Sequence, residues 1–135
     1  MFVLTFILTI GLSIQQSVTP NFIGMTKDEV LSSMQKTNPG CDLDEGSVNT
    51  TYKYLKFVDK ENEETWLIFL SEDDICTHTK LISDYSNLKI RTDELNKKFK
   101  KAGELKWVFI EKGIVYTVEM KKEEWFFTII TKKKK

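Results

Sequence analysis

The sequence predicts an α+β fold, with two tandem αβββ repeats forming one antiparallel sheet and both helices on one face. Two observations predict it. Each half of the chain has a helix-like stretch followed by three short runs rich in β-branched and aromatic residues, and the 135 residues suffice for one core but not for two. We therefore expect a single domain over residues 17–135, with repeats at about 22–83 and 87–131.

Residues 1–16, MFVLTFILTIGLSIQQ, contain no charged side chain. Their apolar run is shorter than the roughly 20 residues that a transmembrane helix needs, and it is typical of the core of an export signal. Gly11 and Ser13 are small residues suited to cleavage, although no basic residue follows Met1. A buried N-terminal strand and an uncleaved anchor are the alternatives. We expect a signal peptide over 1–16, a periplasmic or secreted protein, and no stable membrane span.

A capping box at residues 26–29, TKDE, predicts the start of the first helix. The Thr26 hydroxyl can accept a hydrogen bond from the Glu29 amide, while the Glu29 carboxylate reaches back to the Thr26 amide. Apolar residues such as Val30 and Met34 continue the helix, and an Asn-Pro-Gly sequence ends it. The motif is therefore interpreted as a helix start and not as a catalytic motif.

A loop at 38–50 should separate this helix from a three-stranded antiparallel meander, because it is rich in Gly, Pro, Asn and Asp. The predicted strands are 51–58, 65–70 and 75–82. The turns between them are short and acidic, as expected of exposed hairpin connections.

The same order recurs in the second half of the chain. Residues 87–103 place apolar side chains on one helical face, at Leu88, Leu95, Phe99 and Ala102. Three further strands are predicted at 104–111, 114–120 and 124–130.

Aligning 28–36 with 93–101 pairs Val30 with Leu95 and Met34 with Phe99. One such unit has a small core and an open sheet edge, whereas two units joined edge to edge bury a continuous apolar layer. We therefore expect a duplicated unit and a six-stranded sheet.

Charge is divided unevenly between the two halves. Residues 17–85 carry 6 basic and 13 acidic side chains, and residues 86–135 carry 14 basic and 7 acidic ones. The halves should attract each other, and the basic half could meet an acidic partner or anionic lipid headgroups. Export argues against nucleic acid as the partner.

The two cysteines, Cys41 and Cys76, fit an exported protein because an oxidising compartment allows a disulfide between them. Two unpaired buried thiols are the alternative. Their separation matches neither a redox pair nor a zinc ligand set, so we expect no metal site.

Catalysis has little support in the sequence. The only histidine, His78, stands between two threonines in a predicted strand, without a motif that would supply a nucleophile. The acidic turns should lie at opposite ends of the sheet, too far apart for a paired-carboxylate mechanism. We expect no enzyme and no cofactor.

Several predicted strands are apolar on both sides of their alternation, so one aromatic set should face away from the helices. Such a surface would bind a protein or peptide, unless a loop, the N-terminal segment or a second chain covers it. The candidate binding residues are Trp66, Trp107, Phe109, Trp125 and Phe127. The alternative function is a small-molecule or lipid carrier with an apolar pocket between the helices and the sheet.

The segment FIGMTKDEV, residues 22–30, resembles the small lipoproteins of the bacterial outer-membrane assembly machinery, in which a Gly-Met-Thr-x-x-Glu-Val stretch opens a helix ahead of a three-stranded sheet. The doubled unit resembles the β-lactamase inhibitor protein fold, in which tandem repeats present a concave sheet to a partner enzyme. No lipid-attachment cysteine follows the signal here. The resemblance implies an envelope protein that binds other proteins.

Overall fold

The computed structural model describes residues 21–45 and 53–135, so the expected signal at 1–16 lies outside the described residues. The described part is α+β, as predicted, with one antiparallel sheet and two α-helices. The helices are α1 (Lys27–Thr37) and α2 (Leu88–Lys98), and the short 3-10 helix η1 (Tyr85–Asn87) leads into α2. The strands are β1 (Asp42–Leu43), β2 (Tyr54–Asp59), β3 (Glu64–Leu70), β4 (Cys76–Asp84), β5 (Lys100–Gly103), β6 (Lys106–Glu111), β7 (Ile114–Lys122) and β8 (Phe126–Lys133).

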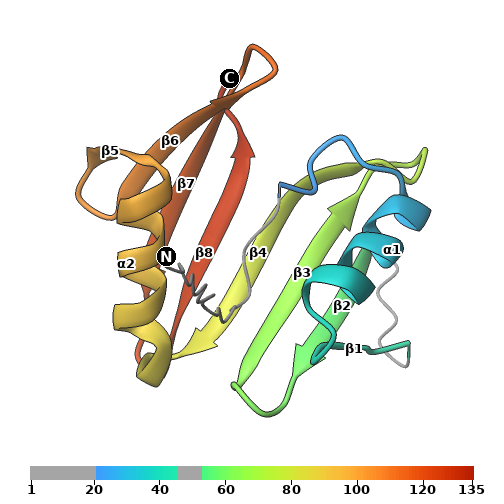
Figure 1. Cartoon of the computed structure of the whole chain (residues 1–135), viewed down its shortest axis with the longest axis horizontal. Helices are drawn as coiled ribbons and strands as arrows, with labels where there is room; N and C mark the ends of the chain where they lie inside the picture. The colour runs from blue at the N-terminus through green and yellow to red at the C-terminus, as the bar shows by residue number, and fades with distance from the viewer. Residues whose placement is uncertain (1–20, 46–52) are drawn as a thin grey trace, which may run out of the picture.

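The strands follow the order β1-β2-β3-β4-β8-β7-β6-β5 across the sheet (Figure 1). The first half of the chain supplies β1 to β4 and the second half supplies β5 to β8. They meet at the centre, where β4 pairs with β8 from His78↔Lys132 to Asp84↔Phe126. Hydrogen bonding therefore continues from one half of the chain into the other without a break.

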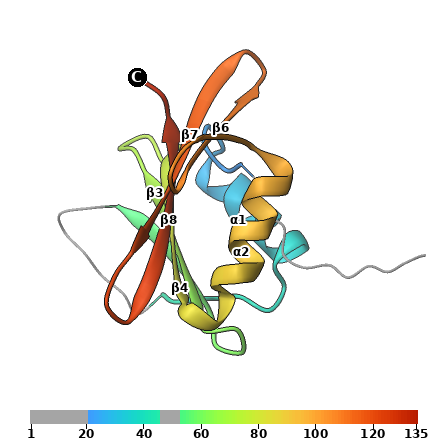
Figure 2. The same cartoon turned by 90° about the vertical axis from the view of Figure 1, so that its left-hand side faces the viewer.

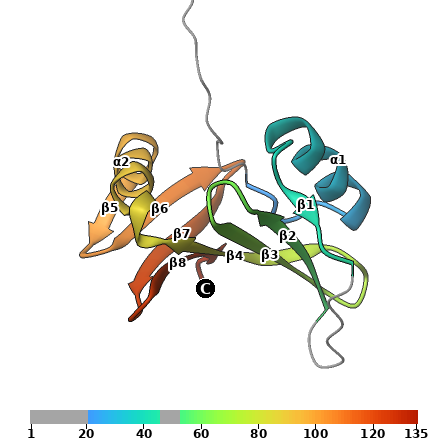
Figure 3. The same cartoon turned by 90° about the horizontal axis from the view of Figure 1, so that it is seen from below.

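Both helices are drawn on the same side of the sheet in Figures 2 and 3. Helix α1 lies over the β1–β2 end and α2 over the β5–β6 end. The side chains of α2 reach the strands below, because Trp107 Nε1 on β6 donates to Asn96 Oδ1 at 2.9 Å. Arg91 of α2 likewise lies over the Trp66 ring of β3.

The predicted start of the first helix is confirmed. The Glu29 amide donates to Thr26 Oγ1 at 3.2 Å, and the Thr26 amide donates to Glu29 Oε1 at 2.9 Å. Val30 and Met34 are the buried residues of α1. The capping box therefore satisfies two backbone donors that would otherwise be unpaired at the helix N-terminus.

Two expected elements differ from the structure, and the sheet has eight strands in the described part where six were expected. The expected loop at 38–50 contains β1, which pairs with β2 at one edge. The expected helix at 87–103 ends at Lys98, and the chain continues as β5 at the other edge. Phe99 causes this exit because its backbone is extended and its ring stacks on Phe109 at 4.4 Å, so Ala102 is exposed instead of buried.

The core lies between the sheet and the helices. Residues of this layer are in register across the strands, as in Phe57↔Trp66, Trp66↔Leu81 and Leu81↔Ile129. Both outer strands are short, and every residue of β5 is exposed. Short edge strands, with the exposed Lys100 and Lys101 on β5, discourage pairing with another sheet, so the broad faces are the surfaces that position a site.

Candidate functional site

The sheet face that points away from the buried core is here called the open face. Along β2, β3 and β4 its side chains alternate with buried ones, which gives the burial patterns of these strands a period of two. Its centre consists of Tyr54, Lys56, Leu67, Phe69, His78, Lys80, Ile82, Ile130 and Lys132. Nearly all of these are partly exposed, and Lys132 is exposed.

An aromatic row crosses the open face over three adjacent strands, where Tyr54 pairs with Phe69 and Phe69 with His78. The Phe69 and His78 rings are stacked, with centroids 4.3 Å apart and an interplanar angle of 5°. The Tyr54 and Phe69 rings are tilted, with centroids 5.7 Å apart. Stacked rings of this kind form a rigid, partly apolar platform.

The surroundings of His78 in this row favour the neutral form of its imidazole. Burial, and then the charge of Lys132 across the β4–β8 pair, hold the pKa of its imidazole below the ordinary value. Its Nδ1 lies 3.0 Å from the Thr77 hydroxyl. The neutral imidazole that this shift favours adds aromatic contact area to the row.

Lysines border the aromatic row. Lys56, two residues from Tyr54 on β2, forms an ion pair with Asp44 at 3.4 Å. Within residues 21–45 and 53–135, Lys80 and Lys132 form no ion pair of 4.0 Å or less. The centre of the open face therefore combines apolar side chains with two uncompensated positive charges.

The five aromatic residues predicted from the sequence as binding residues do not lie at the centre of the open face. Trp66, Trp107 and Phe127 are buried in the core, at most 3 % exposed. Phe109 shares their face and stacks on Tyr116 as well as on Phe99. Trp125 alone among the five is exposed, at 77 %, between β7 and β8.

The open-face row was missed because Phe69 stands in an uninterrupted apolar run, TWLIFL, whose alternation does not show which set is buried. The lysines in the neighbouring strands do indicate which side chains face outward. Lys56 alternates with Leu55 and Phe57, and Lys80 alternates with Thr79 and Leu81, so each lysine marks the outward set of its strand.

A cavity of about 270 Å³ lies on the opposite side of the sheet, under α2; it is here called the α2 cavity. Most of its walls are apolar, and they include Phe22, Trp66, Leu81, Leu95, Phe109 and Ile129. Its polar side chains include Asn21, Glu94, Lys98 and Glu111. Two of the nominated residues, Trp66 and Phe109, therefore line a cavity instead of an exposed surface.

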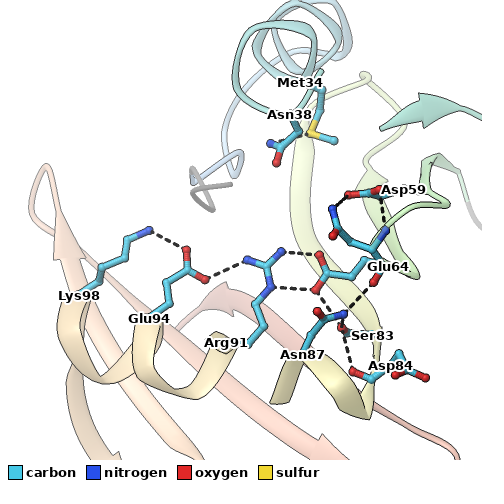
Figure 4. Close-up of polar contacts among 11 residues, drawn as sticks. Met34, Asn38, Asp59, Glu64, Ser83, Asp84, Asn87, Arg91, Glu94 and Lys98 are labelled. Carbon is cyan, nitrogen blue, oxygen red and sulfur yellow. Dashed lines mark hydrogen bonds and ion pairs between the residues drawn. The ribbon is translucent and has the colours of Figure 1, made fainter. Parts of the chain in front are cut away.

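An alternating chain of charges runs from Lys98 and Glu94, which line the α2 cavity, to Arg91 and Glu64 beyond it (Figure 4). Arg91 donates from Nε to Glu64 Oε2 at 2.9 Å and from its second terminal nitrogen to Glu64 Oε1 at 2.6 Å. Its first terminal nitrogen donates to Glu94 Oε1 at 2.9 Å, and Lys98 Nζ lies 3.8 Å from Glu94 Oε2. The Ser83 hydroxyl donates to Glu64 at 2.8 Å.

Burial opposes the charge on Arg91, but its hydrogen bonds to Glu64 and the charges of Glu64 and Glu94 outweigh burial and raise the pKa of the guanidinium. Among the described residues, Arg91–Glu64 is the only ion pair between the two halves of the chain. Every other ion pair joins residues of the same half. The expected attraction between the halves is thus concentrated in one buried contact.

The candidate disulfide between Cys41 and Cys76 is not present, and both thiols are free. Burial, and then the charge of Asp59, raise the pKa of Cys41 to about 11. Burial raises the pKa of Cys76 to about 12, and its Sγ lies 3.7 Å from the His78 carbonyl. Both side chains are therefore protonated at neutral pH, and desolvated thiols are poor nucleophiles.

In the part of the chain that the structure describes, no group of three or more His, Cys, Asp or Glu side chains could hold a metal ion. Neither α1 nor α2 is long and apolar enough to cross a bilayer.

Comparison with known proteins gave no match, either among protein-family models or among curated proteins and solved structures. The resemblance to envelope lipoproteins and to the inhibitor fold therefore stays a prediction.

Proposed function

We propose that this chain is an exported, non-enzymatic domain of the bacterial envelope that binds an acidic protein or peptide through the open face of its sheet. The observation that carries the proposal is the juxtaposition of the Tyr54–Phe69–His78 row with Lys80 and Lys132. Aromatic side chains supply contact area at low cost in side-chain entropy, and uncompensated lysines select a partner of opposite charge.

The dimensions of the open face suit a protein partner. Without the two short edge strands, the open face spans the six strands β2, β3, β4, β8, β7 and β6. At a spacing of about 4.8 Å and a strand length of roughly 20 to 30 Å, they give a surface on the order of 500–700 Å². A standard interface buries about 800 Å² on each partner. The open face would therefore supply most of one side of such an interface.

The duplicated unit belongs to the same proposal. Each half contains one α-helix followed by strands. Outward from the central β4–β8 pair both halves follow the same order, from their last strand to their first. This order supports a tandem repeat with both helices on one face, in which the second copy completes the sheet. The alignment of Val30 with Leu95 is in keeping with it, because both side chains are buried.

Export, the other part of the proposal, is tested by determining where the mature chain begins. Mass spectrometry of the protein recovered from the producing cells would show a mature chain that begins near Ser17. A protein that retains residues 1–16 would contradict a cleaved signal.

The binding test reverses one charge on each side of the molecule. Lys80→Glu changes the open face, and Lys97→Glu makes the same change on an exposed position of α2. Each variant, carrying an affinity tag, is used to capture proteins from an envelope extract. We expect wild type and Lys97→Glu to retain the same acidic protein, and Lys80→Glu to bind it at least about tenfold more weakly, or about 1.4 kcal/mol.

Equal capture by Lys80→Glu and wild type would contradict the proposal. Anionic phospholipid vesicles serve as a second arm. If the chain binds vesicles and captures no protein, its partner is a membrane surface and the proposed protein partner is wrong.

A second candidate function, carriage of a small apolar molecule, is supported by the α2 cavity. Its volume of about 270 Å³ lies just below the usual range for ligand sites, about 300–1,000 Å³, and suits a small ligand. Its walls are mainly apolar with a few polar groups, which is the usual composition of such sites.

A further inference from the structure

We infer that the α2 cavity binds a small aromatic amine in its protonated form. The inference rests on the second candidate function, because it names the ligand class of the same cavity. It concerns the side of the sheet opposite the open face and is therefore independent of protein binding there.

The walls select for an aromatic ring. Trp66 and Phe109 contribute aromatic side chains from the sheet, and Phe22 and Phe99 contribute two more from the segments beside it. Phe109 is already held between Phe99 and Tyr116, with centroids 4.4 and 4.9 Å away. A ligand ring therefore meets side chains whose orientation is fixed before binding, which lowers the entropic cost of binding.

The volume limits the size of the ligand. Cavities of about 150 Å³ lined by apolar side chains bind benzene. The α2 cavity, at about 270 Å³, has room for a molecule with two fused rings and a short substituent. A long acyl chain needs a longer cavity.

The polar side chains select for a positive charge. Glu94 and Lys98 line the cavity, and Glu94 is also paired with Arg91, which in turn pairs with Glu64. The charges of this chain therefore balance one another. Glu111 is not part of this chain of charges. Its Oε1 accepts a hydrogen bond from the neutral Asn21 Nδ2 at 2.8 Å, and among residues 21–45 and 53–135 no cationic side chain forms an ion pair with it.

Glu111 lies on the same strand as Phe109 and two residues beyond it, so both side chains project to the cavity side of β6. An ammonium group attached to a ring between Trp66 and Phe109 can therefore reach the Glu111 carboxylate. An anionic ligand would place its charge next to Glu111 and would be disfavoured.

The test compares three probes that share one ring system and differ in charge. They are 1-naphthylmethylamine, which is protonated at pH 7, the neutral 1-naphthalenemethanol and the anionic 1-naphthylacetate. Each is titrated into the ¹⁵N-labelled chain while the three indole NH signals are followed by NMR. Trp66 lines the cavity and Trp125 is exposed, so the two signals separate specific from surface binding.

We expect the amine and the alcohol to shift the Trp66 signal, with the amine bound about two- to fivefold more tightly, since Glu111 is exposed and its charge is screened. The anion should bind most weakly. Glu111→Gln should abolish the difference between amine and alcohol. Glu119→Gln, the same change in an exposed residue of neighbouring β7, should preserve it.

Two variants locate the binding. Leu81→Phe adds volume inside the cavity and should weaken the binding of all three probes, whereas Leu67→Phe on the open face should not. Equal affinity of amine and alcohol in the wild-type chain would overturn the charge preference and leave the carrier function standing. Absence of any Trp66 shift, or binding unaffected by Leu81→Phe, would overturn the carrier function as well.

Discussion

Replacing Arg91 by Met tests the buried contact between the two halves. The change keeps an unbranched apolar stem but removes the partner of Glu64, which is 5 % exposed. The Ser83 hydroxyl then remains as a hydrogen-bond donor to the Glu64 side chain. A buried carboxylate that loses its charged partner destabilises a protein by about 3 to 5 kcal/mol.

That cost is a large part of the total stability, since a domain of this size is stable by about 5 to 15 kcal/mol. It corresponds to a fall in Tm of roughly 10 to 20 °C. Removing the charge of the carboxylate as well should recover part of the loss. The double variant Arg91→Met, Glu64→Gln is therefore expected to be more stable than Arg91→Met alone.

The assay is guanidinium unfolding followed by circular dichroism, with Lys89→Met as the control on the same helix. Lys89 also pairs with a carboxylate, Asp93, but both side chains are exposed, so this variant should unfold like the wild type. The reasoning would be refuted if Arg91→Met lost less than about 1 kcal/mol, or if the double variant were no more stable than the single one.

Three further predictions follow from the local chemistry. Titration of the single histidine by NMR should give His78 a pKa below 6.5, and Lys132→Met should raise this pKa. Because the pKa is lower in the folded chain than in the unfolded chain, His78 contributes stability above pH 6.5, and this contribution is lost as the pH falls through the folded pKa. An unchanged or higher pKa in the wild type would contradict this. Cys41 and Cys76 should react with Ellman's reagent at pH 8 far more slowly in the folded chain than in guanidinium. In guanidinium both thiols should react without a reductant, whereas a chain with no titratable thiol under that condition would contain a disulfide. Thr26→Ala should destabilise the domain by about 1 kcal/mol in urea unfolding, and Thr26→Ser should not; equal losses would show that the hydroxyl cap contributes nothing.

The sequence predicted the parts of the fold that depend on neighbouring residues. The capping box needs contacts between residues three apart, so Thr26 and Glu29 fixed the start of α1 before any tertiary contact was known. The end of α2 depends on Phe99 stacking with Phe109, ten residues away, and helical periodicity contains no information about that contact.

The candidate sites were harder to predict because they depend on which side of each strand is buried. An apolar run such as TWLIFL alternates equally well in either orientation, and a shift of one residue exchanges the two faces. Trp66 and Trp107 were therefore expected on a surface, whereas they lie in the core. The α2 cavity depends on segments far apart in the sequence, from Asn21 to Thr131, and no local pattern could reveal it.

Photo-crosslinking in the producing cell tests the proposed interaction surface most directly. Benzoylphenylalanine replaces Leu67 at the centre of the open face in one variant and Lys97 on α2 in another. We expect irradiation to link position 67 to one acidic envelope protein and position 97 to none. Adducts of the same protein at position 97 alone, or no adduct at position 67, would contradict binding through the open face.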